Sequence, residues 1–316
     1  MWISEHEMGG NVRKVCEDET CTIFKVQGKG GEGMMTVYPV FKGCCLIYND
    51  FHMERCDSGF QPRRQIFCID HCREGRIEWA VDRNRYIYVE GGDMQVNSRE
   101  HHCTDFVFPL SHYHGLTISF DVEEVRDELL HIMEGFSVDV VRLREKFCPD
   151  DRTFIMRAGV QVDHIFSELY HLPEHVRLPY FKIKVLELLL FLEALEVPEG
   201  GEDRPYFYKS QVDKVKDIVA LLTDDLEHWY TLEELSERFS FPQTSLKQCF
   251  KGIYGCSISA YMKAYRMNAA ALMLKNTQDP VISIAARVGY ENPGKFAAAF
   301  RSVVGVTPTE YRKNIV

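Results

Sequence analysis

Three polar side chains near the C-terminal end of the chain, Thr244, Lys247 and Gln248, are spaced as neighbours on one face of a helix. Gln can pair with adenine, Lys can reach the acceptor atoms of guanine, and Thr can contact the methyl group of thymine. The apolar residues Leu246 and Phe250 lie four apart and predict the opposite, buried face of that helix. These residue types at this spacing indicate readout of base edges in a DNA major groove.

A second segment, fifty residues later, repeats this pattern with smaller side chains. Phe296 and Phe300 predict its buried face, and Asn292 followed by Pro293 is typical of a helix start. Its expected base-contacting positions are Gly294, Lys295 and Ala298. Because Gly and Ala cannot form bidentate contacts with bases, we predict that the first segment supplies most of the readout and that the second mainly positions the protein. The residues expected to contact DNA phosphates are Lys251, Asn292, Arg301 and Arg312.

Both segments belong to a longer repeat that begins at Leu232 and again at Val281. In each copy a short apolar-periodic helix is followed by a break and a second helix. Residues from Leu246 to Tyr261 recur after fifty positions, whereas residues upstream recur after forty-nine, so the second copy should have one extra residue at its turn. Two such helices at a sharp angle present the second one to DNA, and two copies could read groove segments roughly 10 base pairs apart.

The charge of the chain is divided unevenly. The sequence of 316 residues carries a formal net charge of −10, and residues 1–205 carry −13. Residues 238–316, which contain most of the repeat, hold 11 basic and 3 acidic residues, a net charge of +8. A basic repeat is the expected electrostatic signature of contact with phosphates, and the acidic remainder should weaken nonspecific DNA binding.

The C-terminal hundred residues resemble the DNA-binding domain of the AraC/XylS family of bacterial transcription regulators. The resemblance is carried by YMKAYRMNAAALML from Tyr261, ISIAARVGYENPGKFAAAFR from Ile282 and GVTPTEYR from Gly305. It implies seven helices, with two helix-turn-helix units joined by a linker helix at about Ser257–Lys275. The segment ENPGKFAAAF is most similar to pyochelin-type and related siderophore regulators. By this resemblance the base-reading positions fall on Thr244, Lys247 and Gln248 and, in the second unit, on Pro293, Gly294, Ala297 and Ala298.

The first part of the chain has the pattern of a β-rich domain. Short β-prone runs separated by Gly, Asn, Asp and Pro predict eight strands. The runs are Thr22–Val26, Met35–Val40, Cys45–Tyr48, Gln65–Ile69, Tyr86–Val89, Asp93–Val96, Phe106–Leu110 and Leu116–Phe120. Their spacing favours a sandwich or barrel, and the region resembles the cupin-like sensor domain that many AraC-type regulators carry.

Helical periodicity replaces the strand pattern from Val122 onward. The predicted helices are Val122–Met133, Phe154–Tyr170 and Tyr180–Val197. The last is apolar on more than one stripe, so we expect one side to pack on the β domain and the other on a second subunit. The predicted fold is α+β, with a cupin-like β-sandwich or barrel at 1–121, a helical dimerisation segment and linker at 122–205, and an all-α double helix-turn-helix domain at 206–316.

The interior of such a sensor domain is the expected pocket for a small-molecule effector. Aromatic strand residues should line it. The candidates are Tyr38, Trp79, Tyr86, Tyr88 and Phe108.

The first part of the chain also contains residues that could ligate a metal, but they do not complete the ligand set of a known metal site. The residues of metal-ligating type near strand ends are His52, His101, His102, Cys103, His112 and His114. His112 and His114 lack the downstream Glu that a mononuclear cupin enzyme needs, so no catalytic residue, metal or cofactor is assigned, with an adventitious or regulatory metal as the alternative.

Cysteine and glycine patterns lead to similar expectations. Cys44–Cys45 and Cys68–Cys72 lack the Cys-x-x-Cys spacing of a zinc site, which favours buried thiols, with a redox-sensing cysteine as the alternative. Gly28, Gly30 and Gly33 match a dinucleotide fingerprint, but no helix pattern follows, which favours a loop.

The sequence indicates a cytoplasmic location. No secretory signal is expected, because Glu5, His6 and Glu7 interrupt the N-terminal region. The apolar Tyr180–Val197 segment contains five charged residues and is not expected to cross a membrane. Eleven cysteines without a secretory signal indicate reduced thiols.

These patterns predict a sequence-specific transcription regulator that is not an enzyme, and the resemblance implies a bacterial one. The expected partners are double-stranded promoter or operator DNA, RNA polymerase, a small-molecule effector and a second copy of the chain, with no membrane and no cofactor. Two alternatives are a constitutive regulator whose β domain only dimerises and a metal-dependent cupin enzyme fused to a DNA-binding module. An interior without a cavity would favour the first, and a metal held by three or more of the histidines named above would favour the second.

Overall fold

The computed structural model describes residues 5–60, 64–80, 83–99, 105–132, 138–149, 152–157, 159–197 and 206–315. The chain divides into two units, which we call the N-terminal unit (Met1–Asp82 and Tyr86–Tyr206) and the C-terminal unit (Phe207–Val316 with Arg83–Arg85). Each unit has its own apolar core. Within the described ranges, no helix has the length and apolar character needed to span a membrane.

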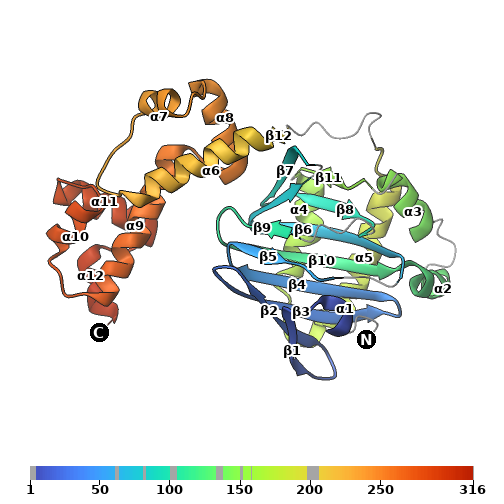
Figure 1. Ribbon diagram of the computed structural model, residues 1–316. Coiled ribbons are helices and arrows are strands. Elements are labelled where there is room, and N and C mark those ends of the chain that lie inside the picture. The colour runs from blue at the N-terminus through green and yellow to red at the C-terminus, as the bar shows by residue number, and fades with distance from the viewer. Residues whose placement is uncertain are drawn as a thin grey trace. The chain divides into compact units, whose positions relative to one another are not determined.

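The N-terminal unit is built on a curled β-sheet (Figure 1). Its strands are β1 (Val12–Glu17), β2 (Thr22–Gly28), β3 (Gly31–Phe41), β4 (Cys44–His52), β5 (Arg55–Asp57), β6 (Ile66–Ala80), β7 (Arg85–Glu90), β8 (Met94–Asn97), β9 (Asp105–Val107), β10 (Tyr113–Asp121) and β11 (Phe154–Met156). The main order is β1-β2-β3-β4-β10-β6-β7, and all of these neighbours are antiparallel. The long strand β6 pairs with β10 and β8 along its first half and with β7 and β9 along its second, which helps the sheet to curl.

The two faces of the sheet have different neighbours, because successive strand residues point to opposite sides. Along β4, Leu46 and Tyr48 pack against helices, whereas Asn49 and Phe51 face the inside of the curl. The helices and helical turns of this unit are α1 (Glu5–Met8), α2 (Val122–Ile132), α3 (Val140–Phe147), α4 (Val160–Leu169), η2 (Glu174–Val176) and α5 (Arg177–Ala194). Residues of α2 to α5 share one core with the outer face of the sheet.

Each of the eight predicted runs overlaps an observed strand, and the helices predicted to begin at Val122 and Tyr180 correspond to α2 and α5. The helix predicted over Phe154–Tyr170 is wrong at its start, because residues 154–156 form β11 and α4 begins only at Val160. Strand β11 pairs with β8, a long-range partner that periodicity cannot reveal in three residues.

The described part of the C-terminal unit contains a short strand, β12 (Phe207–Tyr208), and the seven helices implied by the resemblance (Figure 1). They are α6 (Lys209–Asp224), α7 (Leu232–Arg238), α8 (Gln243–Tyr254), α9 (Ile258–Asn276), α10 (Val281–Arg287), α11 (Pro293–Val304) and α12 (Pro308–Ile315). Helix α9 is the expected linker helix. The predicted fold is therefore confirmed as a curled sheet with helices followed by a helical domain, whereas the cupin likeness and the dimerising role stay predictions.

Candidate DNA-binding surface and interior cavity

The first helix-turn-helix unit consists of α7 and α8. Thr231 and Glu234 cap the start of α7 reciprocally, each side chain accepting a hydrogen bond from the other's backbone N–H. Leu246 and Phe250 on α8 are fully buried. The predicted DNA contacts left exposed on α8 are Thr244, Lys247, Gln248 and Lys251. Helix α8 ends where Gly255 adopts a φ of 77°, a left-handed conformation that favours glycine.

The second unit consists of α10 and α11. Asn292 caps α11, because its side-chain oxygen accepts hydrogen bonds from the backbone N–H groups of Gly294 and Lys295 at 2.9 and 3.0 Å. The predicted start of this helix at Pro293 is confirmed. Phe296 and Phe300 are fully buried. The residues left exposed are Pro293, Gly294, Lys295, Ala298 and Arg301, with Ala297 half-buried.

The turn of the second unit is one residue longer than that of the first, as predicted. Residues 239–242 separate α7 from α8, and residues 288–292 separate α10 from α11. Gly289 in the longer turn has a φ of 78°, and a Cβ atom there would lie 2.6 Å from the Leu226 carbonyl oxygen and 2.7 Å from Trp229 Nε1. Only glycine fits this close approach without a shift of the backbone.

A buried arginine connects the two helix-turn-helix units within this domain. Arg266 of α9 is only 2% exposed; it donates a hydrogen bond of 2.8 Å to the His228 carbonyl oxygen and its guanidinium carbon lies 3.7 Å from the Trp229 ring centroid. Trp229 in turn donates from Nε1 to the Gly289 carbonyl oxygen at 2.6 Å. Burial lowers the pKa of Arg266. These contacts tie the loop before α7 to the turn before α11, and so help to fix α11 relative to α8.

Two of the predicted phosphate contacts have partners inside the domain. Arg312 donates a hydrogen bond of 2.8 Å to the Asp279 carbonyl oxygen, and Asn292 uses its oxygen as the helix cap. Two exposed arginines that the sequence interpretation left out, Arg238 and Arg287, end α7 and α10 at equivalent positions. Since the first helix of such a unit crosses the DNA backbone, both are further candidates for phosphate contact, although Arg287 donates a hydrogen bond of 3.1 Å to the Asp279 carboxylate. Their shared offset of forty-nine residues was the signal that could have found them.

Comparison with known proteins supports the assignment of a helix-turn-helix domain. Residues 235–314 match the family model described as a helix-turn-helix domain, a range that contains α8 to α11 complete. The C-terminal unit therefore contains a helix-turn-helix domain. The match does not extend to the N-terminal unit, so the role of that unit has to be inferred from its own geometry.

Relatives matched over part of the chain are named as transcriptional activators. Over 130 residues the chain is 27% identical to the HTH-type transcriptional activator RhaR of Mannheimia succiniciproducens, covering 40% of the chain and 46% of that protein. Over 99 residues it is 30% identical to RhaR of Yersinia pseudotuberculosis, covering 31% of the chain and 34% of that protein. The chain thus spans less than half the length of either relative. The solved DNA-binding domain of AdpA in complex with a target DNA is 22% identical over 32% of the chain and 91% of that domain, with a TM-score of 0.31.

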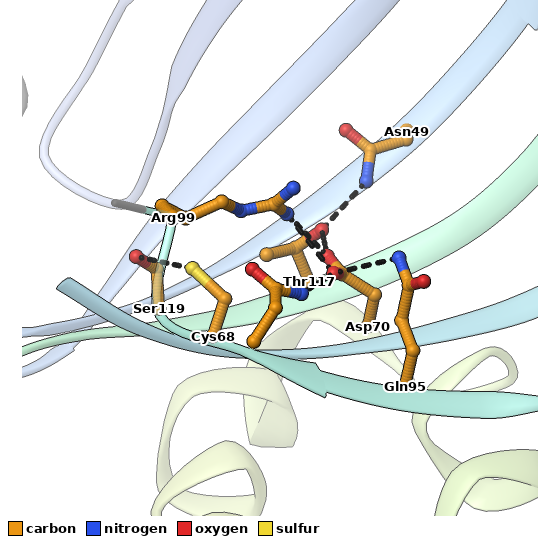
Figure 2. Close-up of polar contacts among 8 residues, drawn as sticks. Asn49, Cys68, Asp70, Gln95, Arg99, Thr117 and Ser119 are labelled. Atoms are coloured by element: carbon orange, nitrogen blue, oxygen red, sulfur yellow. Dashed lines mark hydrogen bonds and ion pairs between the residues drawn. The ribbon is translucent and has the colours of Figure 1, made fainter. Parts of the chain in front are cut away.

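The N-terminal unit contains an open cavity of about 170 Å³ on the inside of the curled sheet. Aromatic rings form much of its wall, among them Phe51, Trp79, Phe106, Phe108 and Tyr113. A polar patch completes the wall, and Figure 2 shows how its side chains converge. The side chains of this patch are Asn49, Asp70, Gln95, Arg99, Thr117 and Ser119.

Asp70 is the centre of the polar patch. The register places it between Gln95 of β8 and Thr117 of β10, which donate hydrogen bonds to its carboxylate at 3.0 and 2.6 Å. Asn97 donates a third at 2.8 Å, and Arg99 Nη2 lies 2.8 and 3.0 Å from the two carboxylate oxygens. Burial alone would lower the pKa of Arg99, but attraction to Asp70 holds that pKa above its ordinary value. Asp70 and Arg99 form an ion pair whose formal charges cancel.

Arg99 also has an unusual backbone, with a φ of 58°. A left-handed conformation is uncommon for a residue other than glycine, and it persists where surrounding contacts demand it. The sequence interpretation missed this site. Its signal was the alternation of Gln95, Asn97 and Arg99 with the apolar Met94 and Val96, which predicts one polar and one apolar face of a single strand.

The predicted pocket residues fall into two groups. Trp79 and Phe108 line the cavity. Tyr38 instead lies in the core shared with the helices, where its hydroxyl accepts a hydrogen bond from Arg177 at 2.9 Å. Tyr88 donates to the Glu78 carboxylate at 2.5 Å and, like the half-buried Tyr86, is not among the lining residues. Strand register, which the sequence does not specify, decides which aromatic residues point inward.

The cysteine and glycine patterns have ordinary structural roles. Cys44, Cys45 and Cys68 are buried, and burial raises the pKa of each thiol, so all three stay protonated. The glycines of the fingerprint-like pattern lie in the β2–β3 hairpin, where Gly28 pairs with Gly31.

Two of the histidines predicted near strand ends lie close together in the structure. His52 and His114 meet beside Asp50 on the outer face of β4 and β10. The ring of His112 lies 5.9 Å from that of His114, and its Nδ1 lies 3.0 Å from the Leu110 carbonyl oxygen. The candidates at 101–103 lie outside the described residues.

Proposed function

We propose that this protein is a sequence-specific transcription regulator whose C-terminal unit binds DNA and whose N-terminal unit binds a small effector. The observation that carries the proposal is the repeated helix-turn-helix, in which both second helices bury aromatic or aliphatic residues inward and leave the residues at the repeat-equivalent reading positions exposed or, for Ala297, half-buried. The net charge of +8 over residues 238–316 supports contact with phosphates. RNA polymerase as a partner and a pyochelin-type specificity stay predictions.

In this proposal α8 and α11 contact DNA in different ways. Helix α8 exposes Thr244, Lys247 and Gln248, which can form base-specific contacts. The equivalent positions of α11 are Gly294, Ala297 and Ala298, which allow close approach but offer no side-chain hydrogen bond. Base readout should therefore come mainly from α8, and α11 should hold the second groove segment through Lys295 and Arg301.

The DNA-binding role is tested by selecting binding sites from random DNA with the full chain and footprinting the selected site. We expect two protected major-groove segments roughly 10 base pairs apart, with stronger base preference in one of them. A single protected segment, or equal affinity for selected and random DNA, would contradict the proposal.

The cavity supports the effector role. Its volume of about 170 Å³ is close to that of an apolar core cavity of about 150 Å³ that accepts benzene. Trp79 Nε1 and Gln95 Oε1 are buried and have no hydrogen-bond partner among the described residues, so a ligand with one acceptor and one donor would satisfy both. The neutral Asp70–Arg99 pair favours an uncharged ligand, because a net charge would lose its hydration without a free counter-charge.

We therefore expect a neutral effector of about one ring with a polar edge. The test compares benzamide with benzoate, its anionic analogue, by calorimetry and thermal shift on the full chain. Benzamide should bind, benzoate should bind at least about tenfold more weakly, and Trp79→Phe should weaken benzamide about fivefold by removing one hydrogen bond. Equal binding of both compounds, or an unchanged affinity in the variant, would contradict this assignment and leave the DNA-binding test unaffected.

The exposed stripe of α5 supports a homodimer. Ile183 and Leu190 are 62% and 39% exposed, and the half-buried Leu186 lies between them at helical spacing. In this proposal the stripe packs on the same stripe of a second copy, as in a two-fold symmetric interface. Ile183→Glu should reduce the mass measured by light scattering to that of one chain, whereas Gln161→Glu on the exposed face of α4 should leave it unchanged. A monomeric parent chain would exclude the dimer.

The observed cavity argues against a β domain that only dimerises, since that alternative called for a filled interior. The enzyme alternative called for a metal held by three histidines. Among the described residues the only metal-ligand group contains two histidines and lies outside the cavity, so it does not form a cupin-type catalytic centre.

A further inference from the structure

A second group of chemistry-bearing residues lies where β4 pairs with β10, apart from the cavity and the DNA-binding surface. Asp50 and His52 share one face of β4, and His114 on β10 lies directly opposite Asp50. The Nε2 atoms of His52 and His114 lie 2.9 and 3.1 Å from the same atom, Asp50 Oδ1. One ligand atom from each of the three residues lies within 4.8 Å of the other two.

We propose that Asp50, His52 and His114 form a zinc-binding site. Imidazole nitrogen and carboxylate oxygen are donors that suit Zn²⁺, and three protein ligands with one open position for water form a common zinc site. Ligand atoms bound about 2.05 Å from a tetrahedral ion are about 3.3 Å apart. The two separations from Asp50 Oδ1, 2.9 and 3.1 Å, need to change by only a few tenths of an ångström. The ligand atoms of His52 and His114 lie within 4.8 Å of each other, and their separation has to reach the same value when an ion binds.

The surroundings of the three side chains also suit an ion. His114 Nε2 is buried and makes no hydrogen bond within the described ranges, although it lies close to Asp50. The side chains of Asp50 and His52 are 56% and 62% exposed, which leaves a path for the ion to enter. Both β4 and β10 are interior strands of the sheet, so hydrogen bonds on both sides hold the backbone of the ligands.

No metal was expected from the sequence, with an adventitious or regulatory metal as the alternative, and this proposal takes up that alternative. His114 lacks the downstream Glu of a cupin enzyme in its own strand, but strand pairing supplies a carboxylate, Asp50, from the neighbouring one. The site lies on the face opposite the cavity, while the adjacent residues Phe51 and Tyr113 line the cavity. A bound zinc ion would thus join β4 to β10 and stiffen one wall of the cavity without entering it.

The test is calorimetric titration of the full chain with zinc chloride, after treatment with a chelator. We expect one zinc ion to bind at this site, with affinity at least about tenfold weaker in His52→Asn and in His114→Asn, since each removes one of three ligands. His131→Asn, at an exposed position on α2, is the matched control and should bind zinc like the parent chain. Circular dichroism of every variant checks that the fold is retained.

Substitution with Co²⁺ identifies the ligands independently of any variant. The proposed site should give the visible absorption of a tetrahedral ion with nitrogen and oxygen ligands, and zinc should raise Tm by about 5 °C at a concentration one hundred times the dissociation constant. A near-ultraviolet thiolate-to-cobalt band would place the metal on cysteines and overturn the proposal. Zinc affinity that is unchanged in both histidine variants, or no zinc binding by the parent chain, would also overturn it.

Discussion

The two units of this protein differ in where their charged candidate side chains lie: on the exposed surface in the C-terminal unit, and in the interior in the N-terminal unit. In the C-terminal unit, Lys247 and Arg301 lie on exposed helix faces while Phe250 and Phe300 fill the inside. In the N-terminal unit the Asp70–Arg99 pair lies inside the curled sheet. Exposed charges contribute to binding with little effect on folding, whereas a buried charge destabilises the fold when its partner is removed.

The largest effect is expected from Asp70→Ala. The change leaves the Arg99 guanidinium in a protein interior without its counter-charge, and breaking a buried pair in this way costs about 3–5 kcal/mol of unfolding free energy. Urea unfolding of the full chain, followed by circular dichroism, measures the loss. The double variant Asp70→Ala with Arg99→Met should recover most of it, because no unpaired charge is left. An Asp70→Ala cost below about 1 kcal/mol would show that Arg99 is well hydrated, as an exposed cation would be.

A smaller effect is expected from pH through His71. This imidazole stacks on Phe166 with ring centroids 4.4 Å apart, and burial lowers its pKa to about 4. The unfolded chain, with a His pKa of about 6.5, binds this proton more readily than the folded chain, so stability is complete above that pH and falls as the pH is lowered toward 4.

Between pH 7.5 and 5 this residue should account for a loss of about 2 kcal/mol in unfolding free energy. The measurement is urea unfolding at a series of pH values for the parent chain and for His71→Leu, in which this contribution is absent. Parallel pH curves for the two proteins would contradict the prediction.

Base preference should respond to changes on the outside of the C-terminal unit. Gln248→Ala removes a side chain that can contact a base, and we expect discrimination at one base pair to fall by about 1–3 kcal/mol with stability unchanged. The repeat places Ala298 at the position equivalent to Gln248, so Ala298→Gln should add a preference for adenine in the second groove segment. Site selection from random DNA measures both outcomes. A uniform loss of affinity in Gln248→Ala, with the preference intact, would make Gln248 a phosphate contact.

The smallest effect is expected from Arg301→Ala. Removing one phosphate contact should reduce the dependence of log affinity on log salt by about 1, with little change in base preference. Arg312→Ala is the informative comparison, because Arg312 is bound to the Asp279 carbonyl oxygen. We expect that variant to change stability more than the salt dependence. Equal salt dependence of the parent chain and Arg301→Ala would remove Arg301 from the DNA-binding surface.

The helical reading surface could be predicted closely because its signals are local. The Asn292 cap and the apolar spacing of Phe296 and Phe300 lie within one helix, and both features are observed. The aromatic pocket residues were predicted less well, since Trp79 and Phe108 line the cavity but Tyr38 faces the opposite side of the sheet. A shift of one residue reverses every side chain of a strand, and the local sequence does not specify that register.

The sequence by itself determined the double helix-turn-helix, the asymmetry of its two reading helices and the approximate positions of most strands. Only the tertiary structure decided that Asp70, Arg99 and Thr117 meet inside the sheet and that Asp50 and His114 meet on its outer face. The physical reason is the range of the interactions. Helix caps and apolar periodicity act between residues a few positions apart, whereas the residues in these contacts are 29 to 64 positions apart in the chain.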